Sequence, residues 1–299
     1  MSGDESAATA QLAPDYQNIR EASLCALAAR EPDHVGRIVE ALFPFLITQG
    51  HVAEARGWVE TALADREHLS HRGLVATLIG GGEIARFGGD LDRAIELKEE
   101  ELALVQDDPE LAGWTTGTLA DLCDIALDQG DFERARRYGE ESAAAGGGPR
   151  AAISLAELAL REGRLSVAES YALVALEGFD DGEFNHACVL ETMGEIARRL
   201  GNTTGARIHF NDGLRSFAAI GDGGGVADCL EGLSRLAVDA GDLERAGRLS
   251  GAAHQLRETW GRRPTRTDAP PVEASSAARD RGAAMSLDEA VAYALSSID

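Results

Sequence analysis

One short phrase recurs six times along the chain, and it constrains the fold more than any other feature. In each copy a glycine is followed five positions later by an alanine, as in QGDFERA from Gln129. The glycines are Gly50, Gly89, Gly130, Gly163, Gly201 and Gly241, and the alanines are Ala55, Ala94, Ala135, Ala168, Ala206 and Ala246. The glycines are 39, 41, 33, 38 and 40 residues apart, a period that is typical of stacked helix pairs.

Each of these glycines lies between two apolar patterns of helical spacing. A glycine there can adopt a positive φ and end the first helix, and the Asp, Asn or His that often follows can cap the second. The alanine five positions on is expected where two helices approach too closely for a larger side chain. The apolar content is mostly Ala and Leu, which are good helix formers and poor strand formers.

The pattern resembles the tetratricopeptide repeat, in which a small residue recurs seven positions before the turn glycine. Gly82 and Gly194 match that place. The residues that depart from it are Phe43, Cys123, Ala156 and Ser234. The resemblance implies an all-α fold, a right-handed superhelical solenoid of about six to seven tetratricopeptide-like helix pairs.

A second resemblance extends from Tyr16 to Leu295. The phrases NIREASLCALAAREP, QGHVAEARGWVETALA, RLSGAAHQLRETWGRRP and MSLDEAVAYAL are similar to the C-terminal repeat region of actinobacterial STAND-type ATPase regulators, the LuxR-type and maltose-regulator-like transcriptional regulators. The sequence contains neither a GxxxxGK[ST] phosphate loop nor a recognisable helix-turn-helix module. The resemblance therefore implies a sensor-like repeat module without the ATPase and DNA-binding parts.

Composition and caps divide the chain into four segments. Residues 1–14 are polar, small and unpatterned, which predicts a disordered tail. Residues 15–262 are predicted to form the repeat domain, and 263–285 a Pro/Ser/Arg-rich loop. Residues 286–299 are predicted to form a C-terminal capping helix, in which Ser286 and Glu289 complete a capping box.

Net charge limits the partners of the chain. The formal net charge is −23, so the surface repels phosphate backbones and anionic lipid headgroups. No segment has about 20 uninterrupted apolar residues, and the start carries no basic and apolar leader pattern. We therefore expect a cytoplasmic protein that binds neither nucleic acid nor membrane. The abundance of Arg, Ala and Gly, with one lysine, is typical of a GC-rich bacterial genome.

The first helix of each predicted pair carries a series of charged residues at positions that face the concave side of tetratricopeptide arrays. One acidic position falls six residues before the turn glycine, and a basic position recurs three before it. With their neighbours, these residues are the predicted ligand-binding groove: Glu83, Arg86, Asp124, Glu157, Glu191, Glu195, Arg198, Asp228, Glu231 and Arg235. Such carboxylates can accept hydrogen bonds from an amine, guanidinium or hydroxyl ligand. The alternative is pairing within one helix, Glu83 with Arg86 and Glu195 with Arg198.

Lys98, the only lysine, lies in the apolar stripe of its helix, where related repeats have Val59, Ala172 or Phe210. Beside Glu101, a desolvated lysine with a lowered pKa would suit Schiff-base or general-base chemistry. The alternatives are a lysine whose alkyl stem runs out to solvent and a structural ion pair.

Other clusters of reactive residues give weaker signals. His68 and His71, beside Glu67, could begin a metal site, but a third ligand is not evident and no HExxH spacing occurs. His186, Cys188 and Glu191 raise the same question. We therefore expect no metal and no cofactor. No GxSxG elbow or Cys/His signature indicates a nucleophile.

Together, these features predict a ligand- or partner-binding helical-repeat protein, a sensor or regulatory module that uses an acidic concave groove. The expected partners are a cationic small molecule, a peptide or a protein. The alternative is an enzyme of bacterial secondary metabolism, a cyclase or isomerase that uses groove carboxylates and arginines. A purely structural scaffold is a third possibility.

Overall fold

In the computed structural model, residues 12–181, 183–261 and 275–296 are described, and within them the chain is entirely helical between its turns. The contacts divide it into two compact units that meet in sequence between Ser154 and Leu155, inside α9 (Gly148–Arg161). The predicted repeat domain over 15–262 contains this division. No helix in the described ranges is both long and apolar enough to cross a membrane.

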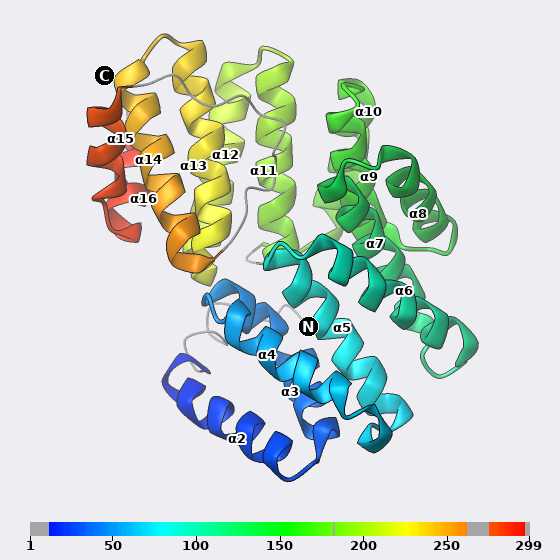
Figure 1. The fold of residues 1–299 in the computed structure, drawn as a ribbon. Helices are drawn as coiled ribbons and strands as arrows, with labels where there is room; N and C mark the ends of the chain where they lie inside the picture. Colours follow the sequence, from blue (N-terminus) through cyan, green and yellow to red (C-terminus); the bar gives the residue numbers. More distant parts are fainter. Residues whose placement is uncertain (1–11, 182, 262–274, 297–299) are drawn as a thin grey trace. The chain divides into compact units, whose positions relative to one another are not determined.

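The unit that ends at Ser154 consists of helix hairpins (Figure 1). Its elements are η1 (Ala13–Asp15), α2 (Tyr16–Ala28), α3 (Pro32–Thr48), α4 (Val52–Ala64), η2 (Arg66–His68), α5 (His71–Phe87), α6 (Leu91–Asp107), η3 (Ala112–Trp114), α7 (Thr115–Gln129) and α8 (Phe132–Ala144). We call α3, α5, α7 and α9 first helices, since each precedes a turn glycine, and α4, α6 and α8 second helices. Of the predicted disordered tail, 1–11 lie outside the described residues, and Ala13–Asp15 forms η1 instead.

The unit that begins at Leu155 continues the same pairing. Its elements after α9 are α10 (Leu165–Gly178), α11 (Phe184–Arg199), α12 (Thr203–Ile220), α13 (Gly223–Asp239), α14 (Leu243–Trp260), α15 (Ser276–Ala283) and α16 (Leu287–Leu295). Here α11 and α13 are first helices, and α12 and α14 are second helices.

The recurring Gly and Ala positions have the predicted roles in every repeat. The six turn glycines have φ between 76° and 82°, the left-handed region that ends a helix at low cost only for glycine. The alanines five positions on have no exposed surface. Side-chain oxygens of Asp90, Asp131, Asn202 and Asp242 accept the backbone N–H three residues later and cap the second helices.

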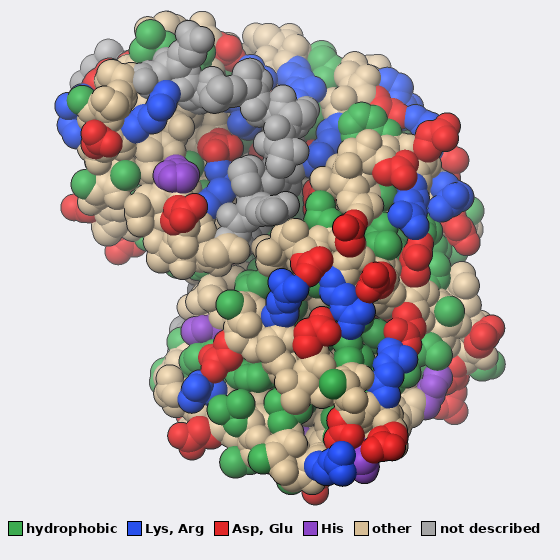
Figure 2. All heavy atoms as spheres, in the orientation of Figure 1, with side chains coloured by type: hydrophobic (Ala, Val, Ile, Leu, Met, Phe, Trp, Pro, Cys, Tyr) green, Lys and Arg blue, Asp and Glu red, His purple; other side chains and the backbone are tan. Residues whose placement is uncertain are grey.

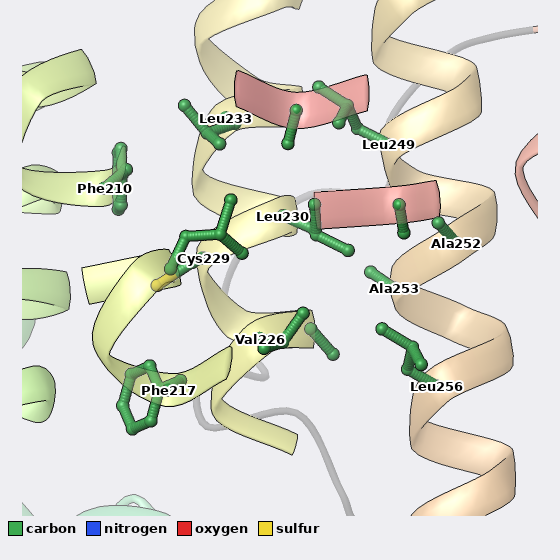
Figure 3. Close-up of a cluster of buried hydrophobic side chains, with 14 of the residues drawn as sticks. Phe210, Phe217, Val226, Cys229, Leu230, Leu233, Leu249, Ala252, Ala253 and Leu256 are labelled. Atoms are coloured by element: carbon green, nitrogen blue, oxygen red, sulfur yellow. The ribbon is translucent and has the colours of Figure 1, made fainter. Parts of the chain in front are cut away.

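Apolar side chains fill the space between α12, α13 and α14 (Figure 3). The ring of Phe210 lies between two first helices at Gly194 and Gly232, where added Cβ atoms would come within 2.6 Å and 2.3 Å of it. These glycines are therefore required by the ring, because any larger residue would displace it.

The C-terminal part differs from the prediction in one element. The segment 263–285 was expected to be a loop, but Ser276–Ala283 forms α15, capped by the Ser275 side chain. Gly251 of α14 and Gly282 of α15 let the two backbones touch, since a Cβ on either would lie about 2 Å from a carbonyl oxygen of the other helix. Composition did not predict this helix, because the helix packs against α14 through glycine residues. The capping box of Ser286 and Glu289 is confirmed.

Neighbouring second helices are joined by arginine–carboxylate pairs on their exposed sides. Arg93 of α6 donates to both oxygens of Glu60 of α4, at 3.0 and 3.1 Å, and Arg66 donates to both oxygens of Glu100 at 2.6 Å. Acidic and basic side chains accordingly alternate over α4 and α6 (Figure 2). Such exposed pairs contribute little stability individually.

We predict opposite effects for two glycine-to-alanine substitutions in the unit that ends at Ser154. Gly130→Ala should lower the free energy of unfolding by about 1 kcal/mol, because φ is +79° while nothing lies within 4 Å of the new Cβ. Gly57→Ala, on the exposed side of α4 with equal space, should raise it by roughly 0.5–1 kcal/mol. Urea unfolding followed by circular dichroism measures both, and equal effects would contradict the assigned role of Gly130.

Candidate functional site

The predicted groove residues lie on the first helices, and most of them belong to two ionic clusters, one within each unit. Glu83 and Arg86 lie on α5, and Asp124 lies on α7. Glu157 lies on the Leu155 side of α9 and pairs with Arg161 at 3.0 Å. The remaining predicted residues are Glu191, Glu195 and Arg198 on α11 and Asp228, Glu231 and Arg235 on α13.

In the unit that begins at Leu155, Glu195 is enclosed by arginines. Arg198 donates to both of its oxygens, at 2.9 and 3.0 Å, and Arg199 donates at 2.8 Å. Arg235 of α13 approaches to 3.5 Å. The expected pairing of Glu195 with Arg198 is confirmed. With three guanidinium groups around a carboxylate that is 2% exposed, Glu195 holds α11 and α13 together.

Asp228 and Glu231 face a buried arginine that the sequence analysis missed. Arg257 of α14, 6% exposed, donates to Asp228 at 2.6 Å and to Glu231. Burial opposes the charge of Arg257, but the two carboxylates raise its pKa above the usual value. The available signal was an arginine within the apolar stripe of its helix, as for Lys98.

The other cluster surrounds Lys98 of α6, which is 1% exposed. Its Nζ lies 2.9 Å from Asp121 Oδ2, 2.9 Å from Glu101 Oε2 and 3.8 Å from Glu83 Oε1. Burial alone would lower the pKa of Lys98, but these carboxylates raise it above the usual value. The structure therefore supports the ion-pair alternative and not the lowered pKa that Schiff-base chemistry requires.

Two arginines extend this cluster to the surface of α5, α7 and α9. Arg86 donates to Asp128 at 2.9 Å and to Asp124 at 3.3 Å, which replaces its expected pairing with Glu83. Arg150 donates to Asp121 at 2.8 Å and to Asp124 at 2.7 Å. We call these eight residues the Lys98 cluster: Glu83, Arg86, Lys98, Glu101, Asp121, Asp124, Asp128 and Arg150.

The sequence analysis found only part of the Lys98 cluster. It identified Glu83, Arg86 and Asp124 as groove residues and Lys98 with Glu101 as a possible pair, but it missed Asp121, Asp128 and Arg150. Asp121 lies nine residues before its turn glycine, a place that faces the neighbouring second helix. This position relative to the turn glycine was the sequence feature that could have identified Asp121.

An aromatic ring fills the position of Lys98 in the other unit. Lys98 and Phe210 each lie nine residues after a turn glycine. A Cβ at Gly82 would come within 2.6 Å of the Lys98 stem, just as one at Gly194 would come within 2.6 Å of the Phe210 ring. Both side chains therefore act as wedges over a glycine of a first helix.

The two wedges differ in what they contact on the next first helix. Phe210 contacts Gly232, whereas Lys98 binds Asp121, and both of these partners lie nine residues before a turn glycine. Buried ion pairs often contribute no more stability than well-packed apolar groups of similar volume. Because an apolar solution exists in the same chain, we infer that the repeat fold does not require the ionic one.

Glu83 and Glu195 occupy the same place in their repeats but have different surroundings. Counted from the turn glycines, the positions that correspond to Arg199 and Arg235 hold Phe87 and Asp124 around Glu83. Glu83 Oε1 is buried and has no hydrogen-bond partner. Burial and the charge of Asp121 raise the pKa of Glu83 to about 7.

His68 and His71 pair with different carboxylates. His68 Nδ1 lies 2.7 Å from Asp65, and Asp65, Glu67 and His68 place three ligand atoms within 4.8 Å of one another. His71 pairs instead with Asp108, at 3.2 Å. The group on η2 is largely exposed, and its contacts are those of an ordinary turn.

His186 and the three tryptophans belong to neither ionic cluster. His186 lies 3.1 Å from Asp181. Trp58 is buried in the core, and Trp260 packs against Gly223. Trp114, at the start of α7, is 45% exposed.

Comparisons with known proteins support the all-α repeat fold and show nothing beyond it. No family model and no curated protein matches the chain. A chain in the crystal structure of the APC/C hetero-tetramer Cut9–Hcn1 aligns over 84% of this chain and 48% of that chain, at 16% identity and a TM-score of 0.60. BtubC (BKLC) from P. vanneervenii aligns over 75% of this chain and 97% of that chain, at 20% identity and a TM-score of 0.48.

The chain is therefore an all-α helical-repeat protein of tetratricopeptide-like pairs. It spans about half the length of the Cut9–Hcn1 chain that it matches. At this level of identity the likeness concerns the fold alone.

We predict that Lys98→Met destabilises the unit that ends at Ser154 by about 3–5 kcal/mol, because it leaves buried carboxylates without a cation. The triple variant Lys98→Met, Glu101→Gln, Asp121→Asn should recover much of this loss, since it removes the stranded charges. Urea unfolding compares the two variants. A triple variant no more stable than the single one would show that loss of packing, and not of charge balance, is responsible.

We also predict an unusual pH dependence from Glu83. Its pKa of about 7 in the folded protein lies above the value near 4.3 of an unfolded chain, so the folded state binds more protons between these values. Stability should therefore fall as the pH rises from about 4.5 to 7, by at most about 3 kcal/mol for this group. In Glu83→Gln this contribution should be absent. Thermal unfolding of both proteins between pH 5 and pH 8 measures the difference, which would stay constant if Glu83 titrated normally.

Proposed function

We propose that this protein is a binding module that uses the charged, partly buried side of its first helices to hold a segment of a partner protein or a small cationic ligand. The observation that carries the proposal is the Lys98 cluster. It places charged groups between α5, α6 and α7, where the other unit packs Phe210 between glycines. A costly charged arrangement that the fold does not require is expected where it has a function.

The sign of the charge supports a cationic partner. Within the Lys98 cluster, five carboxylates (Glu83, Glu101, Asp121, Asp124 and Asp128) face three cations. The formal charge of the whole chain is −23. Both features favour the approach of cations and oppose that of nucleic acid.

The regulatory part of the proposal rests on sequence. The phrases from 18 to 32 and from 285 to 295 are similar to the repeat region of LuxR-type and maltose-regulator-like regulators. In that setting the repeats would bind a signal or partner, and a separate domain or protein would carry the output. The neighbour in the Cut9–Hcn1 hetero-tetramer supports a role in protein assembly.

A thermal-shift screen of the purified chain tests the proposal. The panel contains basic, neutral and acidic peptides of equal length together with cationic metabolites. We expect basic compounds to stabilise the protein, by about 2.7 kcal/mol at 100 times the dissociation constant. The shift should be lost in Asp124→Asn and kept in the control Asp212→Asn on α12, each measured against its own melting temperature.

Two outcomes would contradict this function. Stabilisation by acidic and basic peptides alike would remove the role of charge. Stabilisation that persists in Asp124→Asn would place the binding surface elsewhere on the chain.

A further inference from the structure

We propose that Glu83, Asp121 and Asp124 form a receptor for a single cationic group, a guanidinium or an ammonium, and that the state of Glu83 makes its capture dependent on pH. This inference rests on the proposed binding function and specifies the chemistry of the ligand. It differs from a general acidic surface because it assigns recognition to one position between α5 and α7.

The outer part of the receptor is formed by two carboxylates of α7. Asp121 and Asp124 are 19% and 16% exposed, so both reach solvent. Arg86 and Arg150 donate to the same oxygen of Asp124, Oδ2. Both oxygens of Asp121 already accept hydrogen bonds, Oδ1 from Arg150 and Oδ2 from Lys98. Asp124 Oδ1, to which neither arginine donates, is therefore the outer acceptor for a further donor.

The inner part of the receptor is Glu83, whose side chain lacks the partner that its position demands. It is only 7% exposed, and its Oε1 accepts no hydrogen bond. A buried carboxylate oxygen without a donor costs on the order of 1–3 kcal/mol, and more when it is charged. The molecule therefore contains an acceptor that an incoming cation can compensate.

The internal cations that face Glu83 are already engaged. Lys98 of α6 donates to Asp121 and stands 3.8 Å from Glu83, which is beyond hydrogen-bonding distance. Arg86 of α5 is directed to α7, and Arg150 of α9 binds Asp121. The carboxylate that opposes the ionisation of Glu83 is Asp121.

The matched position in the other unit shows what compensation requires. Glu195 has the same register as Glu83 and is satisfied by Arg198, Arg199 and Arg235. In the repeat of Glu83, only the position that corresponds to Arg198 holds an arginine, Arg86. Its guanidinium donates to carboxylates of α7 and not to Glu83. A guanidinium or ammonium from another molecule would supply the missing charge.

Binding of a cation next to Glu83 favours its ionised form, so capture should release a proton. Because burial and the charge of Asp121 raise the pKa of Glu83 to about 7, the affinity should rise with pH up to that value and then level off. Thermodynamic linkage limits the rise to tenfold per pH unit for one proton. Above pH 8 the dependence should be small.

Isothermal titration calorimetry of the full chain tests this inference with three probes. They are N-acetyl-arginine amide, a five-residue peptide with a central arginine, and the same peptide with citrulline, which has the same shape but no charge. Each is titrated at pH 6, 7 and 8 into the unsubstituted protein, Glu83→Gln and the control Asp212→Asn on α12. Binding by the amide indicates a free small cation as a sufficient ligand, whereas binding by the peptide alone indicates a protein segment.

We expect the arginine probes to bind the unsubstituted protein and Asp212→Asn up to about tenfold more tightly at pH 8 than at pH 6. Glu83→Gln should show less than a twofold change, and citrulline should not bind. Arginine binding with the same pH dependence in Glu83→Gln would overturn the inference while leaving the binding function standing. Equal binding of the citrulline and arginine peptides would overturn both.

Discussion

The close approach of consecutive helices is the constraint on which the rest of the structure depends. Turn glycines with positive φ reverse the chain, and fully buried alanines five residues later let the second helix lie directly against the first. At such short distances each position between the helices admits only certain shapes. The wedge position over Gly82 and Gly194 is one of these, and an aromatic ring and a lysine stem both satisfy its shape. The two side chains differ in the charge that they bring.

That difference has electrostatic consequences across several helices. An ammonium placed between α5 and α7 needs carboxylates, and those carboxylates in turn need the guanidinium groups of Arg86 and Arg150. Desolvation makes every member of such a network costly unless all are satisfied. Compensation is incomplete at Glu83, whose Oε1 accepts no hydrogen bond and lies 3.8 Å from the Lys98 ammonium. Whether a lysine or an aromatic ring occupies the wedge position of a second helix thus determines the polarity of the neighbouring first helices.

The fold could largely be predicted from the sequence, and the site only in part. Glycine and alanine periodicity reports contacts between adjacent helices, so the repeats and their turns were predicted. The helix α15 was not, because it is short and is held by a glycine crossing whose partner, Gly251, lies in another helix. Glu83, Asp124 and Glu195 follow from repeat register. The pairing of Glu195 with Arg198 follows from spacing within one helix. Partners on other helices do not, since such spacing cannot show that Arg150 reaches Asp121 or that Arg257 reaches Asp228.

The burial of Lys98 also determines how the molecule meets amine-directed chemistry. The chain contains no other lysine, and this one is 1% exposed, so the folded surface offers no side-chain amine for acylation, reductive methylation or conjugation to another protein. Acylating reagents would reach Nζ only when α6 separates from α5 and α7. The extent of modification of this lysine, measured by mass spectrometry, therefore reports how often that unit opens.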